Sequence, residues 1–400
     1  MAAPGREPVA SAPMRALLFE RKELRYAAAA VASRILPGSG AGVGPLRLAD
    51  VDPPELPGPD WRTVTPRLTG ICGSDLATVE GRSSRYFEPL VSFPFVPGHE
   101  VVGDLADGSR VALEPVLGAE ARGEAPPFPG AAPGDGDDYG YLIGGPVEDG
   151  IQVGFCATTG GGWGGELVAH QSQIHAVPDD LSDEHAVMLE PAAGGIHAAF
   201  KGHIADGASV VVLGAGTMGL CSIAGVRAHA RPGHLLAVAK YPHQRELARA
   251  LGADQVVGPD EVSRAVRRLV GCRVIGDDLS GGTDVTIDCV GSAASIRQAI
   301  GITRPRGRVV LVGMPGTARM DLTGLWHRET ELVGAYTYGS EVLPDGSMST
   351  DFTLAFDLVR QAGLDRLVSA RYGLDRWREA IAHAAEAGSR GAVKIVFDQR

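Results

Sequence analysis

The stretch that decides the fold runs from Val210 to Gly219 and reads VVVLGAGTMG. It begins as an apolar strand and continues with the spacing Gly-x-Gly-x-x-Gly, and a helical pattern follows from Leu220 to about Ala230. A strand, a glycine-rich turn and a helix in this order are typical of dinucleotide binding, whereas the glycine spacing alone is a weak signal. The stretch therefore predicts a nucleotide site at one end of a parallel sheet.

Each glycine in this stretch has a separate use in such a site. Gly214 permits the tight turn, Gly216 lets the backbone approach a pyrophosphate, and Gly219 lets the helix pack closely on the strand. The helix N-terminus, which begins at Thr217 and Met218, favours the anionic phosphates. These five residues are the candidate cofactor-binding residues of the turn.

Apolar strands alternate with longer helical stretches from Ser209 onward, which indicates βαβ units. We therefore predict an α/β fold class with a doubly wound parallel sheet over residues 201–339. The expected strands are Val210–Leu213, Leu235–Ala239, Val285–Cys289 and Val309–Val312.

The first half of the chain has a different pattern, because residues 14–200 are rich in Gly and Pro and contain short apolar runs. This predicts a β-rich domain with many turns, preceded by a mobile tail at 1–13. Residues 118–150 consist mainly of Gly, Pro, Ala and Asp and are expected to form a long surface loop. Near the C-terminus we expect helices at Phe352–Gln361 and Trp377–Ala387 and a strand at Val393–Phe397.

Composition limits the classes of partner. The 400 residues carry a formal net charge of −11 without a basic stripe, so no nucleic acid and no membrane is expected as a partner. No apolar stretch is long enough to span a bilayer, and the five cysteines are odd in number and widely spaced. The expected location is the cytoplasm, and the expected partner is a small molecule.

The candidate metal ligands are Cys72, His99, Glu100 and Glu190. A thiolate, an imidazole and a carboxylate together can hold one Zn²⁺ and leave a position open for substrate. Their contexts, Gly70-Ile71-Cys72-Gly73-Ser74-Asp75, Gly98-His99-Glu100 and Leu189-Glu190-Pro191, resemble the catalytic-zinc segments of the medium-chain dehydrogenase/reductase family, and in particular its sorbitol-dehydrogenase-like branch.

The resemblance implies a GroES-like β-rich catalytic domain, formed by 14–200 and 340–400, beside a Rossmann nucleotide-binding domain. It implies hydride transfer between an alcohol, or the matching ketone or aldehyde, and a nicotinamide cofactor, with Cys72 and His99 as zinc ligands. The third ligand is open between Glu100 and Glu190. Aromatic side chains near these motifs, Tyr86, Phe87, Phe155 and Trp163, are candidates for the pocket wall.

Two further roles follow from the resemblance. Ser74 stands where the family carries a hydroxyl that binds the substrate oxygen and begins proton transfer, and a hydroxyl can both donate and accept. Asp75 stands where the family orients the ligand histidine, here His99. The position of the relay histidine found in some alcohol dehydrogenases is Ala77, so another proton route is implied.

The choice of cofactor depends on the end of the second strand of the nucleotide domain. Alignment with the family pattern places Ala239 where an acid would bind the adenosine ribose of NAD. Lys240 and Arg245 follow, and their charges suit a 2′-phosphate, so NADP is expected, with NAD as the alternative.

The resemblance fails in one segment. Many zinc-containing relatives bind a second, structural zinc through four cysteines in a lobe near their subunit contacts, but no cysteine lies between Cys72 and Cys156. One zinc is therefore expected, and a homo-oligomer is possible but is not supported by this lobe. The Ala-rich segment 25–44, which shorter relatives lack, has no assigned role.

Two rival functions are a zinc-free enoyl or quinone reductase of the same superfamily and a non-catalytic NADP-binding redox sensor. The zinc-free reductase would not need Cys72 or His99, so their presence argues against it. The redox sensor would not need the complete set of Cys72, Ser74, His99 and Glu190, so the presence of that set argues against it.

Overall fold

The computed structural model describes residues 12–400, and its C-terminal half contains a six-stranded parallel sheet. Val210 and Val212 pack into one apolar cluster and Val211 and Leu213 into another, so β8 is buried on both faces. The predicted α/β class with a Rossmann-like sheet is confirmed. In spatial order the strands are β10 (Gln255–Val257), β9 (His234–Val238), β8 (Ser209–Leu213), β13 (Thr283–Asp288), β14 (Thr303–Leu311) and β15 (Glu331–Gly334).

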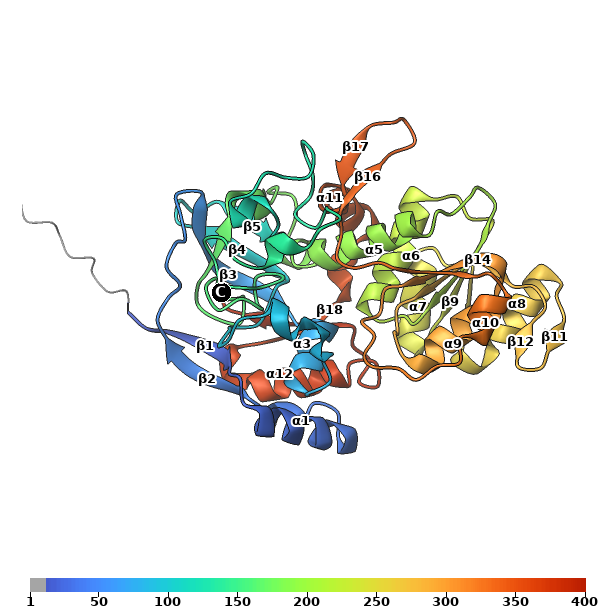
Figure 1. The fold of residues 1–400 in the computed structure, drawn as a ribbon, viewed down its shortest axis with the longest axis horizontal. Helices are drawn as coiled ribbons and strands as arrows, with labels where there is room; N and C mark the ends of the chain where they lie inside the picture. The colour runs from blue at the N-terminus through green and yellow to red at the C-terminus, as the bar shows by residue number, and fades with distance from the viewer. Residues whose placement is uncertain (1–11) are drawn as a thin grey trace, which may run out of the picture.

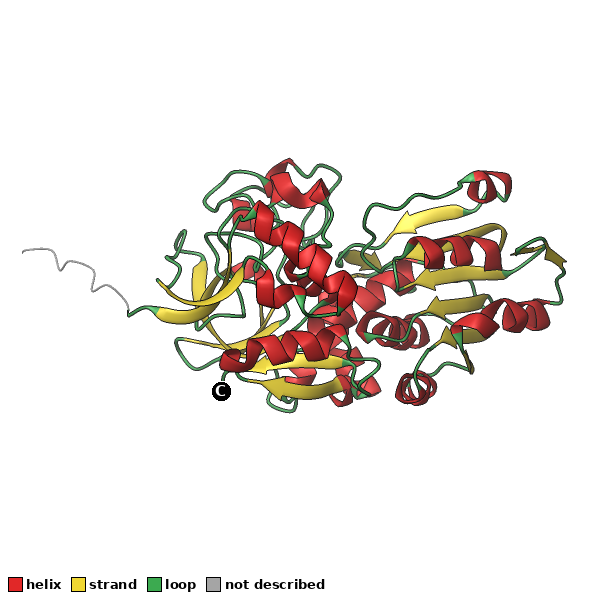
Figure 2. Cartoon of the chain, turned by 90° about the horizontal axis from the view of Figure 1, so that it is seen from below, coloured by secondary structure: helices red, strands yellow, loops and turns green. Residues whose placement is uncertain are grey.

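The glycine-rich turn lies at the point where the strand order reverses, because β8 is flanked by β9 on one side and β13 on the other. Ligands of open α/β sheets bind at the carboxyl ends of the strands at this point. Figure 2 shows helices above and below this sheet. The helices of this region are α6 (Thr217–His229), α7 (Pro242–Ala250), α8 (Val262–Val270), α9 (Ala293–Ile302) and α10 (Thr323–His327), and β11 (Val274–Ile275) and β12 (Asp278–Leu279) form a small hairpin.

The other body of the molecule is built on a seven-stranded sheet, on the left in Figure 1. Its C-terminal strand β19 (Lys394–Asp398) pairs antiparallel with β3 (Trp61–Gly70), so the end of the chain returns to the N-terminal half. The other strands of this sheet are β4 (Val101–Leu105), β5 (Arg110–Leu113), β6 (Leu167–His170), β7 (Ile174–Ala176) and β18 (Val368–Tyr372).

The remaining elements connect and cover the two sheets. The Ala-rich segment forms α1 (Glu23–Ile35) and α2 (Gly40–Val43) between the paired strands β1 (Met14–Phe19) and β2 (Leu46–Val51). None of the helices in the described chain is long and apolar enough to cross a membrane. The others are α3 (Gly73–Val79), α4 (Asp183–Ala186), α5 (Leu189–Lys201), α11 (Asp351–Ala362) and α12 (Trp377–Ala385), with the hairpin β16 (Ser340–Val342) and β17 (Met348–Thr350).

Residues 118–150 form a lobe organised around one buried arginine. The Arg122 side chain is almost fully buried, and its Nη1 donates to the carbonyls of Gly144, Val147 and Glu148 at 2.8–3.0 Å, while Nη2 donates to Gly150 O at 2.6 Å. Tyr141 is also buried, whereas Tyr139 is 55% exposed. The arginine therefore closes a loop that has few apolar side chains.

A second contact joins the lobe to β16. The carboxylate of Asp135 accepts from Ser340 N at 3.0 Å and from Ser340 Oγ at 2.7 Å. These bonds tie the lobe to a strand that lies about two hundred residues later in the chain.

Replacement of Arg122 by methionine should destabilise this lobe. It leaves four carbonyls without their donor, and an unsatisfied buried polar group costs about 1–3 kcal/mol, so we expect a loss of about 3 kcal/mol in the free energy of unfolding. Urea denaturation measures the loss, and limited proteolysis locates it to 118–150. Arg376→Ala, which removes an exposed ion pair with Glu379, is the control and should change stability by less than about 0.5 kcal/mol. An equal loss in both variants would contradict the role of Arg122.

Candidate active site

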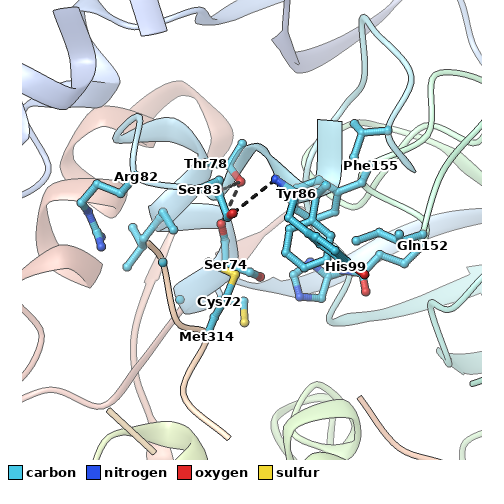
Figure 3. A pocket seen from close by; sticks show the side chains of 18 of the residues that line it. Cys72, Ser74, Thr78, Arg82, Ser83, Tyr86, His99, Gln152, Phe155 and Met314 are labelled. Atoms are coloured by element: carbon cyan, nitrogen blue, oxygen red, sulfur yellow. Dashed lines mark hydrogen bonds between the residues drawn. The ribbon is translucent and has the colours of Figure 1, made fainter. Parts of the chain in front are cut away.

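A cavity of about 1100 Å³ lies between the two bodies and is lined by side chains from both. Cys72 and His99 enter it from the β-rich body, and Met218 and Gly313 enter it from the nucleotide-binding body. Figure 3 shows Cys72, Ser74 and His99 together on its wall. The structure thus brings the predicted metal and nucleotide motifs to one space.

Cys72 and His99 are placed by two backbone features. Cys72 is the N-cap residue of α3 and lies two residues after the end of β3. His99 follows Gly98, whose φ of +97° favours glycine, and a Cβ there would collide with Trp163. Trp163 is therefore a fully buried core residue behind this turn, and the prediction that it is a candidate for the pocket wall was wrong.

Asp75 lies between these two candidate ligands. Its Oδ2 accepts from Cys72 N at 3.0 Å, and its Oδ1 lies 3.4 Å from His99 Nδ1. Burial alone lowers the pKa of His99, but the Asp75 carboxylate and the Cys72 thiol outweigh burial and raise it. Asp75 is therefore positioned to fix the orientation of the imidazole ring.

Glu100 completes a group of three possible donors. One ligand atom each from Cys72, His99 and Glu100 lies within 4.8 Å of the others. Glu100 is also in contact with the ammonium of Lys394, whose Nζ donates to Oε1 at 2.5 Å. Both side chains are almost completely buried, so each charge neutralises the other away from water.

Sequence reasoning missed Lys394. The only local signal was a lysine at the start of the apolar run Val393–Phe397, which ordinarily suggests a solvated strand end. Burial lowers the pKa of this lysine, but the charge of Glu100 outweighs burial and raises it. The lysine therefore stays charged beside the candidate metal site.

Glu190 lies in the first turn of α5 and lines the cavity. It is not part of the three-donor group, but it is close enough to be influenced by the charges of His99 and Glu100. Burial raises the pKa of Glu190 to about 7, and the nearby His99 acts in the opposite direction. Its carboxyl group is thus poised to exchange a proton near neutral pH.

Ser74 lines the cavity from α3, and Tyr86, Phe87 and Phe155 line it as the sequence suggested. The rings of His99 and Phe155 have centroids 5.9 Å apart, so an aromatic side chain borders the candidate ligand. Ala77, at the position of the missing relay histidine, is nearly buried and also lines the cavity.

The glycine-rich turn has the geometry that a dinucleotide needs. Gly214 has φ +90°, and a Cβ on Gly219 would collide with Gly214 O, so α6 packs closely on β8. A Cβ on Gly216 would meet nothing within 4 Å, which leaves open space beside the N-terminus of α6, where Thr217 and Met218 begin.

Beyond β9, the position expected for an acid is the buried Ala239, and Lys240 is exposed beside it. Lys240 Nζ lies 5.4 Å from the centre of the Tyr241 ring. Arg245 donates Nε to Ala239 O at 3.0 Å, so its guanidinium is held at the same turn. His243 instead points to Ala392 O, 3.2 Å away, and takes no part in this cationic group.

The other histidines near these motifs are held within the fold. His175 is hydrogen-bonded to the buried Glu114 at 2.7 Å, and His197 lies 2.9 Å from Asp351. His170 is bound to a neighbouring serine hydroxyl. His170 and His175 therefore have protein partners, whereas His197 belongs with Glu341 and Asp351 to a second group of three possible metal donors, which does not line the cavity.

Comparisons with known proteins agree with this geometry. A family model described as "Alcohol dehydrogenase GroES-like domain" matches residues 58–179, and one described as "Zinc-binding dehydrogenase" matches 204–352. Sorbitol dehydrogenase of Homo sapiens is 31% identical over 319 residues, which cover 74% of this chain and 80% of that protein. The chain belongs to the zinc-type medium-chain dehydrogenase/reductase family. As a member, it is an alcohol dehydrogenase that acts on alcohols or polyols with a nicotinamide cofactor.

Other relatives of this family extend over most of the chain. L-idonate 5-dehydrogenase of Vitis vinifera is 26% identical over 375 residues, which cover 89% of this chain and 93% of that protein. The crystal structure of 2R,3R-butanediol dehydrogenase from Bacillus subtilis matches with a TM-score of 0.68 and 22% identity, over 97% of this chain and all of that one. At this identity the structural match supports the fold alone.

The pair of Glu100 and Lys394 should be essential to the stability of the dehydrogenase. Lys394→Met leaves a buried carboxylate without a partner, so we expect the free energy of unfolding to fall by about 3–5 kcal/mol. Urea denaturation after dialysis against a chelator measures this without a contribution from metal binding. The double variant Lys394→Met/Glu100→Gln removes both charges and should recover more than half of the loss. Equal stability of the single and double variants would show that the charges are not coupled.

Proposed function

We propose that this alcohol dehydrogenase uses a single zinc ion, held by Cys72, His99 and Glu100, and NADP(H). The observation that carries the proposal is the convergence of a thiol, an imidazole and a carboxylate within 4.8 Å of one another, with Cys72 and His99 on the wall of a cavity that the nucleotide motif also reaches. This donor set fits the preferences of Zn²⁺. Glu190 lies outside the group, so we assign the third ligand to Glu100.

The chain's own residues divide the work of the reaction. Asp75 faces His99 Nδ1, which leaves Nε2 as the ring nitrogen available to a metal. Ser74 lines the cavity beside Cys72, and its hydroxyl would bind the substrate oxygen and take up its proton. Glu190, whose pKa burial raises to about 7, would exchange protons in place of the missing relay histidine.

When bound, zinc supplies Lewis acidity at the substrate oxygen, and the nicotinamide supplies the hydride acceptor. The protein would align the two sites across the cavity and would exclude water with the side chains that line it. The turn at Gly214, Gly216 and Gly219 would hold the pyrophosphate, and Lys240 and Arg245 would hold the 2′-phosphate. A zinc-free reductase would leave the Cys72 and His99 pair without a use.

Replacement of Cys72 by serine should remove both metal and turnover. Metal analysis is expected to give about one zinc per chain in the natural protein and much less in the variant, with cofactor reduction lowered at least ~100-fold because the Lewis acid is lost. Binding of NADP, followed by fluorescence titration, should change less than about twofold. Cys272→Ser, a thiol outside the cavity, is the matched control. An active enzyme without metal would refute the zinc assignment.

Lys240→Ala should weaken NADP binding selectively. The loss of one charge-assisted contact to a phosphate is expected to raise the Kd for NADP about tenfold and to leave the Kd for NAD nearly unchanged. Lys201→Ala, which removes another exposed lysine, should change neither constant. Equal effects on both cofactors, or none, would favour NAD as the cofactor.

A further inference from the structure

We propose that the alcohol taken by this site carries an aromatic or bulky apolar group and is not a sugar alcohol. The inference rests on the proposed function, since it names the class of substrate for that site. It departs from the names of the curated relatives, several of which are sorbitol dehydrogenases.

The first observation is a row of aromatic rings that begins at the candidate ligand His99. Phe155 lies 5.9 Å from the His99 ring, Phe95 lies 5.3 Å from Phe155, and Phe93 lies 5.4 Å from Phe95, measured between centroids. All four side chains line the same cavity, and Figure 3 shows Phe155 and Tyr86 beside His99. The wall next to the reacting group therefore offers aromatic surface.

Aliphatic side chains continue this surface around the cavity. These side chains favour an apolar substrate, because the free energy of binding becomes more favourable when apolar substrate surface is buried against them. The side chains in question are Leu76, Val91, Ile151, Met218 and Met314.

The second observation concerns the hydroxyl groups of the wall, four of which are hydrogen-bonded to other protein groups. Thr78 Oγ1 donates to Ser74 O at 2.9 Å, and the hydroxyls of Thr78 and Ser83 are 2.9 Å apart. Tyr26 donates to Ser83 O at 3.2 Å, and Thr337 donates to Tyr336 O at 2.8 Å. These groups cannot donate to a substrate without breaking an existing bond.

Within residues 12–400, the side chains of Ser74, Gln152, Tyr86 and Tyr336 line the cavity without a hydrogen bond to the protein, and the Ser84 hydroxyl only accepts one, from Tyr86 N at 3.2 Å. Ser74 serves the reacting oxygen, and Tyr86 and Tyr336 are 71% and 51% exposed, so Gln152 is the one almost completely buried side chain among them that is left for a further polar group. A sugar alcohol brings several more hydroxyls, and each buried hydroxyl without a partner weakens binding by about tenfold.

The partly exposed charged side chains of the cavity wall, which we call its mouth, are also paired with opposite charges. Arg82 Nε is 3.0 Å from Glu80, and Glu88 pairs with Arg21 at 2.8 Å and with Arg85 at 3.0 Å. The mouth thus offers no free cation among these residues to an anionic substrate such as a sugar phosphate.

Helix α1 contributes side chains to the mouth of the cavity, which suggests a role for the Ala-rich segment. Tyr26 and Ala27 line the cavity from this helix. The bond from Tyr26 to Ser83 O and a bond of 2.5 Å from Gly38 N to Glu80 Oε1 hold the segment in place. The cavity of about 1100 Å³ extends from Tyr26 of this helix to Met218 of the nucleotide motif, so it includes the space for the cofactor as well as the space for the substrate.

The test compares three alcohols on the metal-loaded enzyme with NADP: 1-phenylethanol, 2-propanol and sorbitol. We expect kcat/KM for 1-phenylethanol to exceed that for sorbitol at least ~100-fold and that for 2-propanol at least ~10-fold, because only the aryl group meets the aromatic wall. The tertiary alcohol 2-phenyl-2-propanol has no hydrogen to transfer, so its Ki reports binding alone, and it should inhibit far better than glycerol.

Two variants locate the effect. Phe155→Leu and Tyr86→Ala should each lower the ratio of kcat/KM for 1-phenylethanol over 2-propanol by about five- to tenfold with unchanged zinc content. Tyr86 is 71% exposed, so its loss does not threaten folding. Trp326→Ala removes a side chain that is 79% exposed and lies outside the cavity, and it should leave the ratio unchanged.

The outcomes separate the two proposals. If sorbitol is turned over as well as 1-phenylethanol or better, the inference about the substrate is wrong while the zinc dehydrogenase stands. If the zinc-loaded enzyme oxidises none of the three alcohols and 2-phenyl-2-propanol does not bind, both proposals fail. If it oxidises none but 2-phenyl-2-propanol binds more tightly than glycerol, the apolar pocket stands and the proposed reaction fails.

Discussion

The contact on which the site most depends is the buried ion pair between Glu100 and Lys394. A charge taken out of water needs a partner in good geometry, and here the partners lie 294 residues apart in the chain. The pair can form only if β19 lies beside β3, where Val396 is paired with Gly70. Gly70 in turn leaves the space for the carboxylate, because a Cβ there would collide with Glu100. The closing strand of the sheet and the candidate metal site are therefore one structural unit.

Much of this architecture could be predicted because its signals are local. The glycine-rich turn from Gly214 to Gly219 directly follows β8 and continues into α6, so all the signals for it lie in one short stretch of sequence. The structure places the strand, the glycines and the helix as expected. Cys72, Ser74 and Asp75 lie within one turn of α3. Lys394 and Arg122 were missed for the opposite reason. Both residues matter because they are buried and because tertiary packing supplies their carbonyl or carboxylate partners. No periodicity or spacing in the sequence predicts such partners.

The lobe at 118–150 shows how a single guanidinium can close a loop that is poor in apolar residues. Resemblance to zinc-containing relatives would place a closed metal site here, and such a site constrains a loop through four ligands. Arg122 constrains it through four carbonyl acceptors instead, and Asp135 ties it to Ser340. The metal site and the arginine would both restrict the backbone conformations of the loop. The arginine can do so only when the loop encloses its side chain. This explains why a lobe made mostly of Gly, Pro, Ala and Asp still has a buried centre.

The aromatic wall and the buried charges act on each other. The Phe155 ring borders His99, and both His99 and Glu100 are almost completely buried. In such an environment every fixed charge acts more strongly than in water, so the same burial that raises the pKa of Glu190 to about 7 also strengthens the pull of Asp75 on His99. A wall built for polyol hydroxyls would carry more dipoles and water and would weaken these effects. The apolar character of the cavity is thus a condition for the electrostatics of its reacting end as well as a filter for what can enter.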